Sequence, residues 1–452
     1  MVEFERLLQD HDPLFPGLHC GSNALGAHYY DWDGWDGMTL PPFINHPTYK
    51  IKTQVFNNVL KKIKTFNSTD RTITNPLYRW FAPMLPHHQL NQTFPSDMPN
   101  NCNCTTRDPA FSDDSGSLGF AYPFAKIDSV GIPSIQTSIR HSMRESDFLA
   151  FGTITHNGNN SIEHGHNVFH NRVGGEKGTM SPLQSSFDPI FMLHHSNVER
   201  QFMSWQKVWS TRGGKVSLPP EWLMETRLYP WTKPDLVKKG QLSWNTKADV
   251  DVDGNAANMT VNDATVRDWW NFDDLEYEYD EYVPVTKPLK GKESFGKSRI
   301  LMTVWAPVLS SGQYDLLLSH GDEENEKIDS VSLLIGNNLS NDTATTCHQC
   351  QKRSHLTLVY DVSGFVTPFD LAFYQENPES KLGNSVINNL FVYHKGEKYA
   401  VNSDDPSKCI TVKSVRKVKD HMKAIRKELK MRHKMMSKND KSDFKWNCFS
   451  RT

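Results

Sequence analysis

The spacing of apolar residues changes near residue 297, and this change constrains the fold more than any other feature of the sequence. Short β-branched and aromatic runs follow it at even intervals, separated by Gly, Asn, Asp and Pro. These runs are SRILMTVWAPV, QYDLLLSHG, DSVSLLIGN, HLTLVYDVSG, FDLAFYQEN and NNLFVYHKG. Such a pattern predicts an antiparallel β-sandwich or a barrel, and we expect a β-sandwich domain over residues 297–410.

The preceding part, residues 1–285, predicts a different kind of domain. Residues 20–135 are rich in Pro, Gly, Asn and aromatic residues and show little sustained periodicity. A stretch this irregular in a compact protein is usually functional, or held by disulfides and a cofactor. Helical periodicity appears around residues 136–150 and 160–171, and most clearly at 188–208. We therefore expect a mainly α domain with long irregular loops.

Residues 411–452 form a basic tail. Apolar residues recur there at spacings of three and four, at Val415, Val418, Met422, Ile425 and Leu429. This spacing predicts an amphipathic helix with a narrow apolar stripe that packs on the body of the protein. A role at a membrane surface, with an acidic partner or in processing is the less favoured alternative.

The composition is that of a soluble globular protein, with 37% hydrophobic and 23% charged residues. The formal net charge of -2 gives no overall attraction to nucleic acid or to anionic membranes. No apolar run is long enough to cross a bilayer, so no transmembrane segment is expected. The oligomeric state cannot be inferred from the sequence.

Two features predict a secreted glycoprotein, although the first residues, MVEFERLLQDHDP, lack the apolar core of a signal peptide. Asn-x-Ser/Thr sequons begin at Asn67, Asn91, Asn103, Asn159, Asn258, Asn338 and Asn341. The seven cysteines include the pairs Cys102/Cys104 and Cys347/Cys350, in polar, turn-rich segments. We expect disulfide bonds rather than a zinc site there, with Cys20 or Cys448 left over.

Histidines on two predicted helices point to a metal site. His166 and His170 lie four residues apart, which places their imidazoles on one helix face about 5.4 Å apart. Gly174 and Gly175 follow and are expected to end this helix. A lone H-x-x-x-H is weak evidence, because surface helices produce it by chance.

The second helix is expected to start at SSFDPIFMLHHSNVER, with Asp188 as its cap and Pro189 in its first turn. His195 lies two turns further, on a helix whose apolar stripe is Val198, Phe202 and Trp205. Two helices that both direct histidines inward favour a metal site over core histidines, because unpartnered imidazoles are costly to bury. By ligand type alone, copper, zinc, iron and nickel fit equally well.

The combination of the two segments resembles a known family. HNVFH, a Gly-Gly stop and DPIFMLHHSNVER are similar to the copper B signature of the tyrosinase, catechol oxidase and molluscan haemocyanin superfamily of type 3 copper proteins. HYYDWDG at His28–Gly34, the TTRD run at Thr105–Asp108 and the tyrosine-rich DWWNFDDLEYEYDEYVPV also resemble family segments. The resemblance implies a four-helix-bundle copper core, followed by the C-terminal sandwich common in animal members.

Residue by residue, the resemblance implies that His166, His170 and His195 bind copper. His194 and His164 fall outside the ligand face. Residues expected around the ligands are Phe191, packed against the imidazoles, together with His194, Asn197 and Glu199. Position 199 is Asp in the family, so the longer Glu199 carboxylate has to be placed differently.

The family binds dioxygen between two coppers, each held by three histidines. Its enzymes hydroxylate monophenols and oxidise o-diphenols to o-quinones. By resemblance, Glu163 and Asn167 would position a water that deprotonates an incoming phenol, whose ordinary pKa is about 10. For Glu163, an ordinary carboxylate near a helix N-terminus is an equally weighted alternative.

The beginning of the chain departs from the family pattern. MVEFERLLQDHDP resembles the residues that follow the third copper A ligand, so the copper A ligands are expected upstream of Met1. His11, His19, His28 and His46 do not match their spacing. We therefore expect an N-terminally incomplete domain, at most one copper per chain and little phenol oxidase activity from this chain alone.

Three functions remain open at this stage. The first is a secreted, phenol-oxidising copper enzyme of the tyrosinase type, with dioxygen and a small phenol as substrates. The second is an oxygen-binding unit of the haemocyanin type. The third is a degenerate family member that binds one metal or none. The absence of tandem repeats favours the enzyme, because molluscan oxygen carriers are long arrays of such units.

Overall fold

The structure is a computed structural model that describes parts of the chain. The described residues are 47–53, 69–74, 77–78, 104–107, 135–175, 178–180, 183–211, 219, 221–232, 263–270, 278–279, 281–283, 299–307, 311–319, 325–334, 355–363, 365–366, 389–401, 403 and 405–438.

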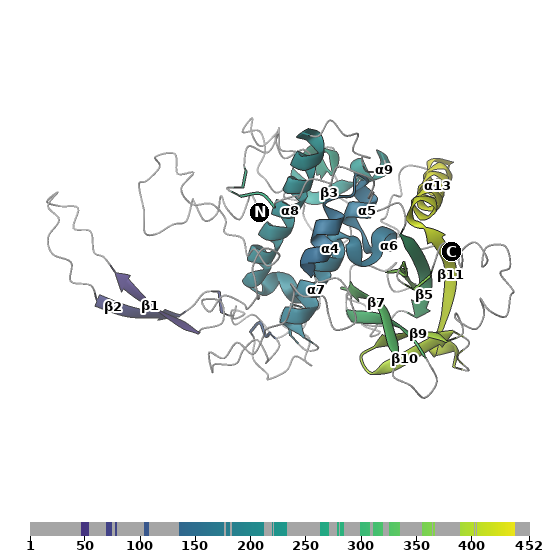
Figure 1. The fold of residues 1–452 in the computed structure, drawn as a ribbon. Coiled ribbons are helices and arrows are strands. Elements are labelled where there is room, and N and C mark those ends of the chain that lie inside the picture. Colours follow the sequence, from purple (N-terminus) through teal and green to yellow (C-terminus); the bar gives the residue numbers. More distant parts are fainter. Residues whose placement is uncertain are drawn as a thin grey trace, which may run out of the picture.

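The helical part contains two long helices and several short ones, grouped in the centre of Figure 1. The α-helices are α4 (Ile135–Ser142), α5 (Phe148–Gly152), α6 (Ile154–Asn157), α7 (Ile162–Gly174), α8 (Ile190–Thr211) and α9 (Glu221–Met224). Short 3-10 helices are η2 (Gly158–Asn160), η3 (Leu183–Phe187) and η4 (Arg267–Trp269). Two small antiparallel sheets pair β1 (Thr48–Thr53) with β2 (Thr69–Thr74) and β3 (Arg227–Thr232) with β4 (Asp263–Thr265).

One apolar core joins α4, α5, α7 and α8. At its centre the Phe151 ring stacks on Trp205, with ring centroids 4.5 Å apart. Trp205 is fully buried, and Val198 and Phe202 pack against the same core, which confirms the predicted apolar stripe of this helix. The helices predicted at 160–171 and 188–208 are present as α7 and α8, whereas the stretch at 136–150 forms two helices, α4 and α5, with a break at residues 143–147.

The ends of α7 and α8 follow from local sequence. The hydroxyl of Ser161 accepts the N–H of His164 and starts α7. Gly175 ends it in a positive-φ conformation (φ 58°), as the glycine pair predicted. Asp188 Oδ1 accepts the N–H of Ile190 at 3.0 Å, which confirms the predicted start of α8.

The C-terminal part is one seven-stranded sheet in the order β7-β6-β9-β10-β11-β5-β8. Its strands are β5 (Ile300–Pro307), β6 (Gly312–Leu318), β7 (Glu326–Leu333), β8 (His355–Asp361), β9 (Leu390–His394), β10 (Glu397–Val401) and β11 (Cys409–Lys417). Five of the six predicted runs form β5 to β9, and FDLAFYQEN lies outside the described residues.

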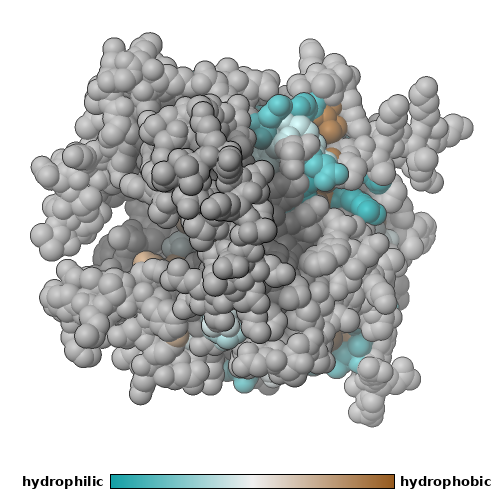
Figure 2. Space-filling model, turned by 90° about the vertical axis from the view of Figure 1, so that its left-hand side faces the viewer, coloured by the Kyte–Doolittle hydropathy of each residue, from teal (hydrophilic) through white to brown (hydrophobic). Residues whose placement is uncertain are grey.

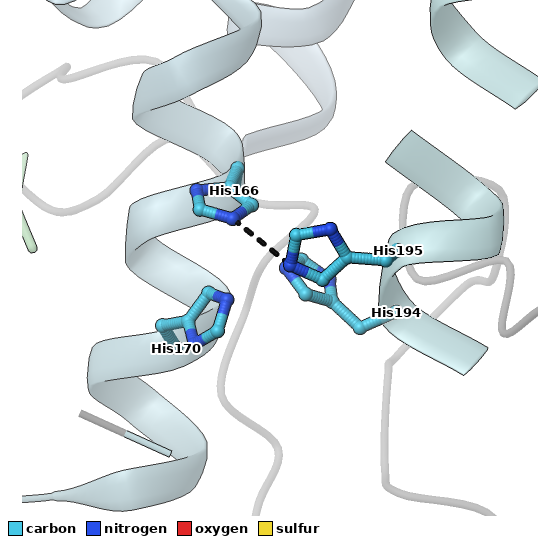
Figure 3. A group of neighbouring side chains, drawn as sticks. All are labelled: His166, His170, His194 and His195. Carbon is cyan, nitrogen blue, oxygen red and sulfur yellow. Dashed lines mark hydrogen bonds between the residues drawn. The ribbon is translucent and has the colours of Figure 1, made fainter. Parts of the chain in front are cut away.

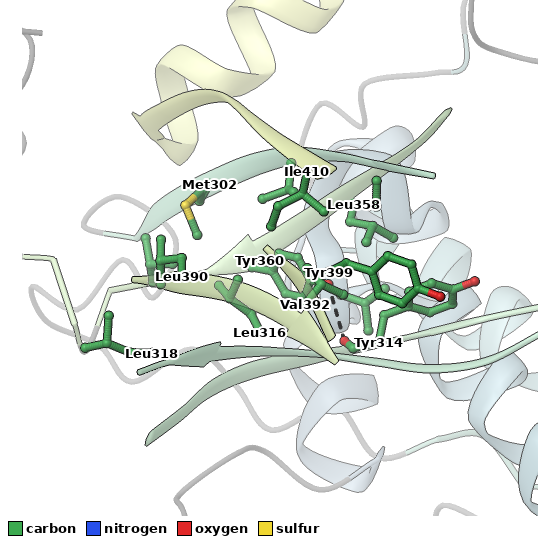
Figure 4. Packing of buried hydrophobic residues seen from close by; sticks show 14 of the residues in the cluster. Met302, Tyr314, Leu316, Leu318, Leu358, Tyr360, Leu390, Val392, Tyr399 and Ile410 are labelled. Carbon is green, nitrogen blue, oxygen red and sulfur yellow. Dashed lines mark hydrogen bonds between the residues drawn. The ribbon is translucent and has the colours of Figure 1, made fainter. Parts of the chain in front are cut away.

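The sheet curls around a single core, so the arrangement resembles a barrel more than two stacked sheets. All seven strands contribute buried residues, many of which Figure 4 shows pointing into one interior. The two edge strands also meet, because the N–H of Asp361 on β8 donates to Asp329 Oδ2 on β7 at 2.6 Å. The structure therefore confirms a β-rich C-terminal domain, but it does not confirm the predicted sandwich of two stacked sheets.

The prediction of a purely antiparallel sheet is wrong for one pair of strands. β10 and β11 are parallel, with Ala400 opposite Cys409 and Val401 opposite Ile410. Parallel pairing usually needs a long crossover, but these strands overlap by only two residue pairs. The short segment with η7 (Pro406–Lys408) is therefore enough to connect them.

The predicted boundary at residue 410 is also wrong, because β11 continues to Lys417. Thr411 to Lys417 pair with β5, and Val415 packs on the barrel core instead of on a helical stripe. Helix α13 (Val418–Lys438) follows, as expected for the basic tail. Val418, Met422 and Ile425 pack against α5 and the barrel, which confirms that the stripe covers the body.

The helical part and the barrel are joined at η2. Gly158 has φ +56°, and a Cβ there would lie 2.3 Å from the carbonyl oxygen of Val359 on β8. The neighbouring Asn159 is 2% exposed and donates to Asp329 Oδ1 at 2.7 Å. Asn159 begins one of the predicted sequons, and its burial excludes a glycan there in the folded protein; the other six sequons lie outside the described residues.

On the face drawn in Figure 2, hydrophilic residues predominate where described residues reach the surface, and hydrophobic ones form small separate patches. None of the described helices combines the length and apolar character needed to span a bilayer. Among the described cysteines, Cys409 is free, and the pairs proposed for Cys102, Cys347 and Cys350 involve residues outside the described parts.

Candidate metal centre

Four histidines meet between α7 and α8. His166 and His170 project from α7, and His194 and His195 project toward them from α8 (Figure 3). One ring nitrogen from each residue lies within 4.8 Å of the others. Within the described parts of the chain, this is the group of side chains whose geometry could hold a metal ion.

His166 and His195 face each other through their Nε2 atoms, 3.4 Å apart. Two nitrogens bound to one tetrahedral ion at 2.0–2.1 Å would lie about 3.4 Å from each other. On the far side of the His166 ring, Nδ1 contacts the Asn167 Oδ1 atom at 2.8 Å. Because an amide oxygen only accepts, Nδ1 carries the proton and Nε2 presents its lone pair.

His170 has the same arrangement one turn further along α7. Its Nδ1 contacts the backbone carbonyl oxygen of Met180 at 2.7 Å, so Nδ1 is the protonated atom here as well. Its Nε2 is buried and has no hydrogen-bond partner in the described structure. A buried imidazole nitrogen without a partner is unfavourable unless something binds it, and a metal ion would do so.

His194 was expected beside the site, and the structure brings it into the same group. Its ring is fully buried and stacks on Phe169, with centroids 4.2 Å apart and planes 7° apart. Its centroid also lies 4.8 Å from that of His170. The stacking gives His194 a packing role that does not depend on a metal. The sequence could not show this, because the contact joins two helices.

The four imidazoles are neutral at ordinary pH. Burial, followed by repulsion from the neighbouring histidines, lowers the pKa of His170 to about 3 and that of His195 to about 2. The pKa values of His166 and His194 are also lowered, mainly by burial. Neutral imidazole is the form that binds metal, so no proton has to leave these rings before an ion enters.

A short segment from the irregular region, Thr106 and Arg107, forms hydrogen bonds close to both helices that carry the histidines. The backbone of Thr106 exchanges hydrogen bonds with Thr179, next to the Met180 carbonyl that orients His170. Arg107 forms a buried ion pair with Asp188 at the start of α8, at 2.6 Å. The TTRD run noted in the sequence therefore supports the site without being part of it.

The two residues expected to hold a water are both engaged by the protein. Glu163 Oε2 accepts the backbone N–H of Ile154 at 2.8 Å, and burial raises its pKa. The Asn167 Nδ2 atom donates to the Ser332 carbonyl on β7 at 3.1 Å. Their role toward a water is therefore untested and stays a prediction.

The other residues expected near the ligands lie along α8. Phe191 stacks on His195, with centroids 4.0 Å apart. The Asn197 Oδ1 atom accepts from Arg200, which is buried. Glu199 Oε2 accepts the hydroxyl of Tyr279 at 3.2 Å. The longer carboxylate at position 199 is thus held by the tyrosine-rich segment.

These donors fit copper. Ring nitrogens of four histidines converge, and for His166 and His170 the Nδ1 atom is fixed by an oxygen acceptor, as is usual for metal-bound histidines. Imidazole ligands also suit zinc, iron and nickel. By geometry alone, this group could therefore hold any of these transition metals.

Comparison with known proteins decides the family. Residues 1–208 match the model of the common central domain of tyrosinase, a region that includes all four histidines. This part of the chain therefore carries the central domain of the type 3 copper superfamily. This family implies copper, and the histidine group is where such an ion could bind.

Relatives within this superfamily have different functions. The chain is 32% identical over 121 residues to haemocyanin beta-C chain unit G of Helix pomatia, covering 26% of this chain and 25% of that protein. It is 29% identical over 210 residues to polyphenol oxidase 4 of Agaricus bisporus, covering 41% and 33%. The matches thus span a quarter to a third of these relatives.

Among solved structures, deoxygenated haemocyanin from Rapana thomasiana aligns with 91% of this chain and 80% of its own, at 15% identity and a TM-score of 0.47.

Proposed function

We propose that His166, His170 and His195 hold one copper ion, and that the protein oxidises phenols and o-diphenols to o-quinones with dioxygen. The main support is the convergence of imidazole nitrogens between α7 and α8 in a chain that matches the tyrosinase central domain. The similarity to polyphenol oxidase 4 of Agaricus bisporus also supports an oxidase function.

Copper would supply the redox chemistry and the binding of dioxygen. The protein's own residues orient the ligands, limit the access of water and exchange the proton. Asn167 and the Met180 carbonyl orient the His166 and His170 imidazoles, as metal ligands require. Phe191 covers the His195 ring and limits the access of water to it. We propose that Glu163, whose pKa is raised by burial, exchanges the phenol proton through a water.

The proposal is tested by loading the full chain with copper, removing unbound metal and measuring copper per chain by mass spectrometry. We expect one copper for the parent and almost none for His170→Ala or His195→Ala. His141→Gln is the matched control, because His141 contacts Asn160 outside the group and should retain the metal. No copper in the parent would refute the site, and two per chain would refute its assignment to a single ion.

Activity is measured as o-quinone formation from catechol by the copper-loaded chain. We expect low turnover that His195→Ala abolishes. Turnover unchanged in that variant would refute the assignment of the chemistry to this site.

A second candidate is reversible oxygen binding, supported by the match to the Helix pomatia haemocyanin unit. The two functions differ in one measurement. A carrier would bind dioxygen reversibly and leave catechol unchanged, whereas the proposed enzyme consumes dioxygen only as quinone forms.

A further inference from the structure

One residue of the barrel contacts the metal-site helix with all three of its polar groups. The backbone N–H of Ser332 donates to His164 Nδ1 at 3.2 Å, and its carbonyl accepts from Asn167 at 3.1 Å. Its hydroxyl accepts from Asn171 at 2.9 Å. The three partners are spaced by three and four residues, which places them on one face of α7. Strand β7 is thus attached along two turns of this helix.

The Asn167 side chain transmits this contact to the metal site, because both ends of its amide are used. A carbonyl oxygen can only accept, so the Ser332 carbonyl requires the amide NH2 group to face β7. The amide oxygen must then face His166, where it accepts the proton of Nδ1 at 2.8 Å. If the amide were reversed, its oxygen would face the Ser332 carbonyl oxygen, and its NH2 group would face the Nδ1–H group of His166.

The consequence is a defined tautomer of His166. With the proton on Nδ1, the lone pair of Nε2 points at His195 Nε2, 3.4 Å away, where the ion would sit. We propose that strand β7 sets the tautomer and orientation of His166 through Asn167, so that docking of the barrel and metal affinity are coupled. Asn167 is therefore a positioning residue. This inference rests on the metal site of the proposed function.

The coupling has to act in both directions. If the barrel contact favours the metal-binding form of His166, then metal binding must strengthen the barrel contact by the same factor. The backbone N–H of Ser332 is a direct reporter, because it donates to His164 within that contact. Its hydrogen exchange should slow when copper binds.

The test compares two asparagines of α7 in the full chain. Asn167→Ala removes the link to His166, and we expect copper affinity, measured by chelator competition, to fall by about 10–100-fold. Asn171→Ala is the matched control: it loses its bonds to the Ser332 hydroxyl and the Leu333 carbonyl but touches no proposed ligand. We expect its copper affinity to stay within about threefold of the parent.

A third variant separates the hydrogen bond of Asn167 to His166 from its hydrogen bond to Ser332. Asn167→Asp keeps an acceptor for His166 and loses the donor to Ser332. We expect the copper-dependent slowing of exchange at residues 326–334 to be lost in this variant. The parent and Asn171→Ala should both show that slowing.

Equal losses of affinity in Asn167→Ala and Asn171→Ala would overturn the inference, because the effect would then be general loosening of the interface. Exchange at residues 326–334 that ignores copper in the parent would also overturn it. Either result leaves the copper site itself intact. A parent chain that binds no copper would refute the proposed function and this inference with it.

Discussion

Replacement of Gly158 by alanine should separate the barrel from the helix that carries two of the histidines. Gly158 lies between α6 and α7, and its carbonyl accepts the hydroxyl of Ser161, the residue that caps α7. The added Cβ would lie 2.3 Å from the carbonyl oxygen of Val359 and 3.2 Å from its carbonyl carbon. Both atoms are backbone, so the strand itself would have to move.

Two costs contribute to the expected loss of stability. A non-glycine residue in the positive-φ region costs about 1–2 kcal/mol. Overpacking against atoms that cannot rotate away adds about 1–3 kcal/mol. The free energy of unfolding should therefore fall by about 2–5 kcal/mol in Gly158→Ala.

Gly396→Ala is the matched control, because Gly396 has φ +85° and, apart from its chain neighbours, no described residue has an atom within 4 Å of the position that an added methyl group would take. Its free energy of unfolding should fall only by the cost of the positive-φ conformation, about 1 kcal/mol. Urea unfolding of both variants and the parent measures the difference. Equal losses in the two variants would refute the claim that close contact with β8 makes Gly158 necessary.

Three further outcomes are expected. His194→Phe, which keeps the aromatic packing of His194, should retain copper, whereas His195→Phe should lose it; the reverse result by metal analysis would contradict the ligand assignment. Asp188→Asn should lower the free energy of unfolding by about 3–5 kcal/mol, because it removes the carboxylate charge that pairs with the buried Arg107; a loss below about 1 kcal/mol in urea would contradict this. Burial lowers the pKa of His421 to about 4, so the unfolded chain binds a proton there that the folded one does not. Stability should therefore decline as pH falls from about 6.5 to 4, less steeply in His421→Phe, as measured by unfolding across that range.

Local chemistry made several features predictable. Ser161 and Gly175 at the ends of α7 and Asp188 at the start of α8 act on backbone groups within a few residues of themselves. The strands β5 to β9 also follow from short apolar runs bounded by turn residues. Strands β10 and β11 were not predicted, and Val415 of β11 was assigned to a helical stripe, because its spacing fits a helix as well as a strand until its partner β5 is known.

The surroundings of the histidines were less predictable. The Met180 carbonyl that orients His170 has no side-chain signal, and a backbone atom leaves no mark in the sequence. The Ser332 contact joins residues more than 160 positions apart. Asn159 matched a sequon, and only its packing against Asp329 shows that it is buried.

The sequence alone predicted the three histidines proposed as ligands and the helices that carry them, because helix periodicity and capping depend on neighbours along the chain. Only the tertiary structure decided how those imidazoles are oriented. Their tautomers depend on acceptors that folding brings from elsewhere: an amide held by a barrel strand for His166, and a loop carbonyl for His170. Hydrogen bonds are directional and short in range, so this part of the site exists only once distant segments are packed together.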